Sequence, residues 1–119
     1  MRSQPKPLEF VASSRRDLRG FPQTAREAAG RELRRVQWDR LPKDWKPMNG
    51  VGPGACEIRV RSSEGGTVQH RVLYVAKFDE AVYVLHAFEK KTRETPRFLL
   101  EVAAARYKQM LRERDDGET

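Results

Sequence analysis

The sequence predicts a single α+β domain, in which a small antiparallel sheet packs against helices. The chain has 119 residues, a length that suits one domain. Apolar residues recur at helical spacing near the start and near the end of the chain, and between these regions apolar and charged residues alternate as they do in strands. Hydrophobic residues make up 38% of the chain, which in so regular a pattern is enough to form a core.

The first element is expected to be a short strand that follows a flexible leader. Residues 1–7 are polar and include prolines, so they are expected to be mobile. Residues 8–11 read Leu-Glu-Phe-Val and predict a strand. A short helix follows, with Ser14 as its N-cap and Asp17 in the place that glutamate takes in a capping box. Glycine and proline at positions 20 and 22 end this helix.

A second helix is predicted to begin at Pro22, because proline suits the first turn of a helix. Small and branched apolar residues fall on one face of this helix, at Ala25, Ala28, Ala29, Leu33 and Val36. Leu41-Pro42 is expected to end it. The two N-terminal helices are expected to cover one face of the sheet.

Residues 42–54 are rich in proline and glycine and are predicted to form a loop. Trp38 and Trp45 lie on either side of its start. Packing of the helix end against the sheet is the favoured role for these indoles, and stacking on a nucleobase is the alternative.

Three strands joined by tight turns are predicted next, and tight turns make such strands antiparallel. Alternation of apolar and charged residues over 56–61 predicts the first strand, and Glu-Gly-Gly at 64–66 predicts a hairpin turn. Residues 68–77 and 82–88 predict the second and third strands, with a turn at Asp79-Glu80. The charged face of this meander is expected to be the working surface.

A final helix is predicted from Thr95-Pro96, an N-cap residue followed by proline at the first helical position. It is expected to run to about residue 112, so that one domain spans residues 8–112. Residues 113–119 are mostly acidic and are predicted to form a disordered tail.

The charge balance favours an anionic partner. The chain has 24 Lys+Arg against 17 Asp+Glu, a net charge of +7, and nucleic acid is the favoured partner over an acidic protein or a membrane surface. Cys56 is the single cysteine, and the two histidines have no zinc-ligand spacing with it, so no disulfide, metal or cofactor is expected. The chain has neither a signal peptide nor an apolar run of membrane-spanning length, which predicts a cytoplasmic protein.

Strand alternation gathers basic side chains on one face of the sheet. Glu57, Arg59 and Arg61 point the same way on the first strand of the meander, and Arg71 occupies the next strand. The third strand adds His86, Phe88 and Lys90, which share parity, so the residues expected to converge are Arg59, Arg71, His86 and Lys90. Arginine grips a phosphate through two N–H donors, and cations stabilise the charge that builds up when a 2′-hydroxyl attacks a phosphodiester. That reaction needs a base, an acid and charge stabilisation, and no metal.

Most of these residues also have a purely structural interpretation. Arg59 and Arg61 are equally consistent with solvated strand residues, and Lys90-Lys91 with a solvated strand end. A lone histidine in an apolar strand, such as His86, is more often a satisfied core residue than a catalyst. Glu57 can serve as the partner of a neighbouring arginine. Arg71 is harder to explain structurally, because it interrupts an apolar strand where an unpaired charge is costly.

Three segments carry a resemblance to a known group of proteins. Residues 52–61 and 70–77 look like the central hairpin of RelE/ParE superfamily toxins. Residues 82–92, with their Leu-His-Ala-Phe-x-Lys-Lys-Thr run, resemble the signature of the phage-derived HigB-like branch. Residues 101–107 are similar to the final helix of that branch, and the likeness spans about residues 7–112.

This resemblance implies the toxin of a type II toxin–antitoxin pair, which cuts messenger RNA on the ribosome without a metal and is neutralised by a helix-turn-helix antitoxin. Arg71 matches the arginine expected at the scissile phosphate, and Lys90 and Lys91 match a basic pair at the end of the last strand. His86 falls near a histidine that some HigB toxins use in catalysis. The predicted catalytic set is therefore Arg71, Lys90, Lys91 and His86. Arg59 matches a basic position on the preceding strand of the family, and with the sheet-face residues Glu57, Arg61 and Phe88 it makes up the set predicted to bind RNA and the ribosome.

The chain departs from RelE in two ways that leave the general base open. It has no match to the catalytic tyrosine beyond the last strand, and Glu57 stands where RelE has a lysine. Two alternatives to the ribonuclease are a ParE-like inhibitor of DNA gyrase and a non-catalytic phage-derived binding protein on the same fold.

Overall fold

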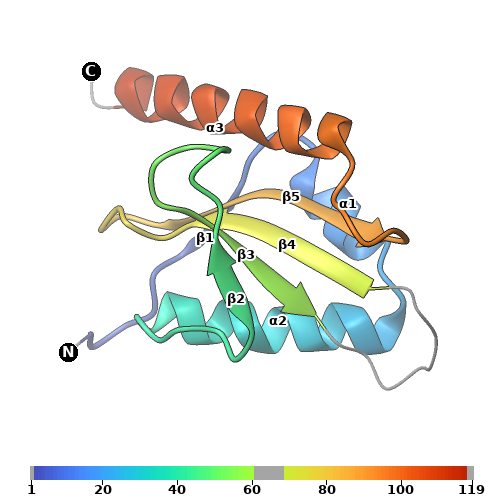
Figure 1. Ribbon diagram of the computed structural model, residues 1–119. Helices are drawn as coiled ribbons and strands as arrows, with labels where there is room; N and C mark the ends of the chain where they lie inside the picture. The colour runs from blue at the N-terminus through green and yellow to red at the C-terminus, as the bar shows by residue number, and fades with distance from the viewer. Residues whose placement is uncertain (1, 61–68, 118–119) are drawn as a thin grey trace.

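The computed structural model describes residues 2–60 and 69–117, which form a mixed sheet between helices (Figure 1). The elements in chain order are β1 (Leu8–Phe10), α1 (Ser14–Arg19), α2 (Gln23–Gln37), β2 (Trp45–Pro47), β3 (Ala55–Val60), β4 (Gln69–Val75), β5 (Val82–Lys90) and α3 (Arg97–Gly117). The α+β class is confirmed, and the order of helices and strands is the predicted one apart from β2. The predicted hairpin turn at 64–66 lies outside the described residues.

The five strands are ordered β1-β5-β4-β3-β2 in the sheet. β3, β4 and β5 pair antiparallel, as the tight-turn argument predicts. β1 instead lies parallel to β5, with Leu8 opposite Val82, so the prediction of a wholly antiparallel sheet is wrong for this strand. The chain passes through two helices and three strands between β1 and β5, and a connection of that length does not fix the direction of pairing.

β2 lies inside the segment predicted to be a loop. It pairs antiparallel with β3, and Trp45, Lys46 and Pro47 face Ile58, Glu57 and Cys56. Proline is tolerated here because β2 is an edge strand, whose outer side needs no donor for the ladder. β2 forms because β3 offers it hydrogen-bonding partners, and its own three residues are too few to predict a strand.

Helices cover both faces of the sheet, and each face has its own apolar core (Figure 1). On one face the predicted apolar stripe of α2 packs against Ile58, Val72 and Val84, as expected. On the other face α3 packs against Leu73 and Leu85. The face expected to be the charged working surface is therefore largely an apolar interface with α3, and it stays open only where β3, β4 and β5 extend past that helix.

α1 is anchored to the sheet rather than capped by its own side chains. Ser14, predicted to be the N-cap, is the first helical residue and is fully buried, and its hydroxyl donates to the carbonyl of Val84 at 2.9 Å. The N-cap position is Ser13, which makes no side-chain capping bond. The capping-box prediction is wrong because the buried hydroxyl finds a partner on β5 instead.

The two ends of the chain are more ordered than predicted. Lys6 is only 5% exposed. Its backbone N–H donates to the carbonyl of Gln37 at 2.8 Å, and its ammonium donates to the carbonyl of Ala76 at 2.7 Å. Lys6 thus ties the leader to the end of α2 and to the residue that follows β4. α3 continues to Gly117, so residues 113–117 are helical and not a disordered tail. Among the helices of the described residues, none has the length and apolar character needed to cross a membrane.

Candidate functional site

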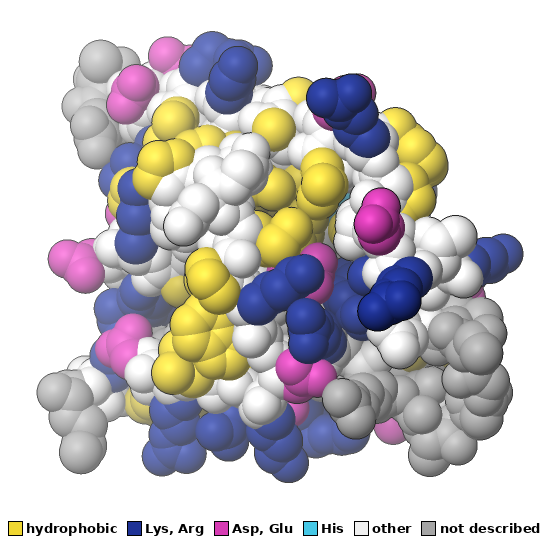
Figure 2. Space-filling model, viewed as in Figure 1, with side chains coloured by type: hydrophobic (Ala, Val, Ile, Leu, Met, Phe, Trp, Pro, Cys, Tyr) yellow, Lys and Arg dark blue, Asp and Glu magenta, His cyan; other side chains and the backbone are white. Residues whose placement is uncertain are grey.

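A basic concavity of about 390 Å³ lies where β3, β4 and β5 extend past α3. We call it the basic concavity. The residues that line it are Arg59, Gln69, Arg71, Lys90, Lys91, Thr92 and Arg93. Five of these seven side chains are cationic. Basic side chains gather near the middle of the face shown in Figure 2, below the apolar side chains under α3.

Strand pairing brings these side chains together. Arg59 lies directly opposite Arg71 across β3 and β4, and Gln69 lies opposite Lys90 across β4 and β5. Like charges in directly opposed positions destabilise a sheet. The arrangement therefore requires a compensating negative charge nearby.

Glu57 supplies that charge from beneath the concavity. Its side chain is fully buried, and Oε1 lies 3.2 Å from Nε of Arg71 and 3.9 Å from Nε of Arg59. Nζ of Lys46, which lies opposite Glu57 on β2, is also 3.9 Å away. Because the carboxylate has no exposed surface, Glu57 acts on the cations and does not contact a substrate. The structural alternative for Glu57, an arginine partner, is what the geometry shows.

Arg71 is held in one orientation by its neighbours. It is 5% exposed, and its terminal nitrogens donate to Oε1 of Gln69 at 2.6 Å and to the carbonyl of His70 at 3.2 Å. Burial lowers the pKa of the Arg71 guanidinium, and Glu57 opposes that shift. Arginine stays protonated in proteins, so the concavity keeps a fixed positive charge in its wall.

Lys90 is the lysine of the basic concavity whose pKa is lowered by its surroundings. Desolvation lowers the pKa of its ammonium, the positive charge of Arg71 lowers it further, and Glu57 partly opposes both effects. A lowered pKa increases the share of lysine in the neutral form at a given pH, and the neutral amine is the form that can accept a proton. Lys91 and Arg93 are exposed, and within the described ranges no ion pair involves either of them.

His86 lies apart from the basic concavity, in a polar network that joins α1, β5 and α3. Its Nδ1 is 3.2 Å from Oδ2 of Asp17, and Arg106 donates to the same oxygen at 2.8 Å and to Oγ of Ser13 at 2.8 Å. His86 is 8% exposed. Desolvation lowers the pKa of its imidazole, Arg106 lowers it further, and Asp17 opposes the shift. This environment is that of a structural histidine.

Phe88 also lies beneath the surface. It faces Arg71 across the strands, is 7% exposed and belongs to the core under α3, with its ring 5.1 Å from that of His86. Arg61 lies outside the described residues. Of the residues singled out from the sequence, the structure brings four to the surface of one concavity, namely Arg59, Arg71, Lys90 and Lys91.

Sequence reasoning missed three contributors. Thr92 and Arg93 follow directly on the Lys90-Lys91 pair, and the length of that basic run was the available signal. Lys46 is the third: the sequence predicts a loop where β2 forms, and without that strand no pattern places the Lys46 side chain beside Glu57.

The sequence matches the family described as Phage derived protein Gp49-like (DUF891) over residues 16–108. The matched segment runs from α1 into α3 and includes every residue of the basic concavity. Comparison with curated proteins gives no match. Since the family model covers well over half of the chain, this protein belongs to the phage-derived Gp49-like family.

Proposed function

We propose that this protein is the toxin of a type II toxin–antitoxin pair, on the HigB-like branch of the RelE/ParE superfamily, and that it cleaves messenger RNA on the ribosome without a metal. One observation carries the proposal: five cationic side chains surround an open concavity, and a buried carboxylate beneath it orients two of them. Such a cluster fits a phosphodiester, whose charge rises in the transition state. The resemblance of the strand and helix segments to HigB-like toxins supports the ribosome as the place of action.

The proposed chemistry is attack of a ribose 2′-hydroxyl on the adjacent phosphorus. Lys90, in its neutral form, takes the proton of the 2′-hydroxyl as the new O–P bond forms. Arg71 and Arg59 bind the non-bridging oxygens, whose negative charge increases. The bond from phosphorus to the 5′ oxygen then breaks, Lys91 donates a proton to that oxygen, and a 2′,3′-cyclic phosphate remains.

The partners belong to the same proposal. A helix-turn-helix antitoxin would neutralise the toxin by covering or deforming the basic concavity, and the ribosome would present the messenger RNA to it in the cytoplasm. Single-stranded RNA exposes its phosphates and its 2′-hydroxyls, which are the groups that the concavity suits.

Purified protein added to ribosomes programmed with a messenger RNA tests the activity. We expect new RNA ends that carry 2′,3′-cyclic phosphates, and we expect Lys90→Ala or Arg71→Lys to reduce their formation at least tenfold, the usual scale for losing a charge-stabilising or proton-transfer group. Lys108→Ala, an exposed position on α3, serves as the matched control and should cut normally.

Expression in growing cells separates the alternatives. If growth arrest persists in Arg71→Ala while messenger RNA stays intact, the ribonuclease assignment fails. Arrest with intact messenger RNA and blocked DNA supercoiling would identify a gyrase inhibitor, and the absence of arrest in cells that make wild-type protein would point to a non-catalytic binding protein.

A further inference from the structure

A second cluster of arginines lies at the C-terminal end of α2, on the side of the sheet away from α3. Its residues, called the α2 patch below, are Arg31, Arg34, Arg35, Trp38 and Arg40. They line a concavity of about 460 Å³, within the ~300–1,000 Å³ range of ligand sites. A row of basic side chains follows the lower edge of the molecule in Figure 2, where α2 lies in Figure 1.

The last turn of α2 fixes the shape of this patch. The backbone N–H of Asp39 donates to the carbonyl of Val36 at 3.0 Å, and the backbone N–H of Arg40 donates to the carbonyl of Arg35 at 2.8 Å. These two hydrogen bonds form the Schellman pattern of a helix end. Asp39 adopts a positive φ of 61°, a conformation that aspartate tolerates better than most residues. This turn carries the chain back so that Arg40 lies beside the end of the helix.

Among the described residues, three of the four arginines of the α2 patch have no acidic partner. Asp39 is engaged by Arg2, at 2.8 Å, and by Lys6. Glu32 accepts a hydrogen bond from the backbone of Lys43 at 2.9 Å and lies 3.9 Å from Arg35. The remaining arginines of the patch are exposed, and their side chains have no partner among residues 2–60 and 69–117; they are Arg31, Arg34 and Arg40.

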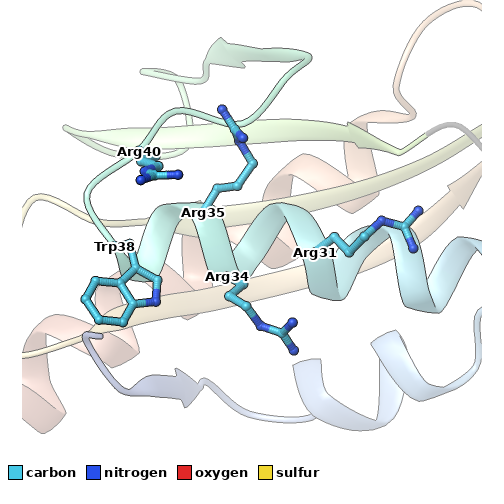
Figure 3. A pocket seen from close by; sticks show the side chains of 5 residues that line it. All are labelled: Arg31, Arg34, Arg35, Trp38 and Arg40. Carbon is cyan, nitrogen blue, oxygen red and sulfur yellow. The ribbon is translucent and has the colours of Figure 1, made fainter. Parts of the chain in front are cut away.

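Trp38 gives the patch a flat apolar surface among these charges. Its side chain is 40% exposed, although packing against the sheet was the expected role of this indole. Figure 3 shows Trp38 and Arg34 projecting from the same side of α2, with Arg31 one turn earlier. The seven steps from residue 31 to residue 38 correspond to a rise of about 10 Å at helical spacing, enough to span more than one nucleotide.

We propose that the α2 patch is a second RNA-binding surface, which takes a single-stranded segment with its phosphates against the arginines and a base stacked on Trp38. Guanidinium groups suit phosphates because their N–H donors form a fork, and aromatic faces accept any base. An acidic peptide is a poorer fit, since the exposed apolar surface here is one indole and not a groove for a row of side chains. The binding does not require RNA cleavage and is separate from the basic concavity on the other face.

The test measures binding of a fluorescent single-stranded RNA of about 12 nucleotides to the full chain. Arg59→Ala/Lys90→Ala serves as the background, so that the basic concavity contributes little. In that background Arg31→Ala/Arg34→Ala should weaken binding about tenfold and reduce the slope of log K against log salt by about 1.4, since each lost phosphate contact on a single strand accounts for about 0.7. Lys108→Ala/Arg112→Ala removes the same charge from an exposed face of α3 and should leave affinity within about twofold.

Stacking is tested separately with Trp38. Trp38→Ala should weaken binding about tenfold and Trp38→Phe much less, because phenylalanine keeps an aromatic face. In a Trp45→Phe chain Trp38 is the single tryptophan, and RNA should quench its fluorescence. This measurement needs no substitution in the α2 patch. Circular dichroism of each variant checks that α2 still folds.

Three results would overturn the proposal. Equal losses in the α2 and α3 double variants would show that only net charge matters. Unchanged indole fluorescence on saturation with RNA would rule out stacking on Trp38. Binding of a polyglutamate peptide to the patch, with no RNA binding there, would make it a protein-docking surface.

Discussion

At the residue scale, the environment of Glu57 explains how two arginines can face each other in one sheet. A fully buried carboxylate is stable only when charges and hydrogen bonds compensate for its desolvation, and Glu57 has cations within 3.2 to 3.9 Å on three sides. The cations are Lys46, Arg59 and Arg71. Without the carboxylate they would repel one another across β2, β3 and β4.

Glu57→Gln should therefore lower the free energy of unfolding by about 3 kcal/mol, the lower end of the range for breaking a buried ion pair. Urea unfolding followed by circular dichroism measures the change. Glu101→Gln is the matched control, because its carboxylate is 69% exposed and the pair that it forms with Arg97 contributes little. A loss in Glu57→Gln no larger than in the control would show that the cations do not depend on Glu57.

The buried imidazole of His86 should make the protein less stable in acid. Burial lowers the pKa of His86 below its ordinary value of 6.5, so the unfolded chain binds more protons than the folded chain between these two values. Stability from this group is fully present above pH 6.5 and is lost as the pH falls through the folded pKa. Glutamine at position 86 cannot titrate, so His86→Gln should unfold with a smaller loss of stability between about pH 7.5 and pH 5.

Urea unfolding of both proteins across this range provides the measurement. Carboxylate titration contributes to both curves and largely cancels in their difference. Parallel curves for wild type and His86→Gln would mean that the histidine does not drive the acid sensitivity.

At the element scale, the segment between β2 and β3 is held against α3 by a close contact. The hydroxyl of Tyr107 donates to the carbonyl of Pro53 at 2.6 Å, and the tyrosine ring lies directly over Gly52. A Cβ added at Gly52 would lie 2.5 Å from the ring carbons, a distance at which either the ring or the loop must move. Only glycine lets the loop approach α3 this closely.

Gly52→Ala should lower the free energy of unfolding by about 2 kcal/mol, in the range that overpacking costs. Gly50→Ala provides the control within the same loop, because a Cβ there would meet no atom within 4 Å. Thermal unfolding of both variants gives the comparison. Equal melting temperatures for the two would indicate that the loop moves away from Tyr107 at little cost.

The elements also show how far sequence reasoning reaches. The strands β3, β4 and β5 and the helix α2 were predicted because their apolar residues follow a strict local period. The edge strand β2 is not predictable in this way, because its three residues are too few to show a period. The parallel direction of β1 is not predictable either, because it depends on β5, a partner strand far away in the sequence.

The residues of the candidate site also differ in whether the sequence predicts their positions. Alternation along strands placed Arg59, Arg71 and Lys90 on one face correctly. His86 lies on the same face, but α1 and α3 cover its side chain. The residues near His86 in the sequence do not predict either of these contacts. The exposure of Trp38 follows from how the helix ends, which sequence patterning also left open.

At the scale of the whole molecule, which has a net charge of +7, two clusters of cationic side chains lie on opposite sides of the sheet. Opposite placement bears on the proposed action on the ribosome. Under that proposal, one surface would hold the RNA strand to be cut and the other would contact a different RNA segment, so that the two sets of phosphate contacts add.

Affinity for ribosomes should consequently fall steeply with salt. The five cations of the basic concavity alone, at about 0.7 per phosphate contact, predict a slope near −3.5 and a loss of about 100-fold between about 50 and 200 mM salt. Sedimentation of the protein with ribosomes over a salt series measures this. Arg59→Ala/Lys90→Ala should reduce the slope by about 1.4, whereas Lys108→Ala/Arg112→Ala should leave it unchanged. A flat salt response would exclude the basic concavity as the docking surface, because displaced counterions are an unavoidable consequence of phosphate contacts.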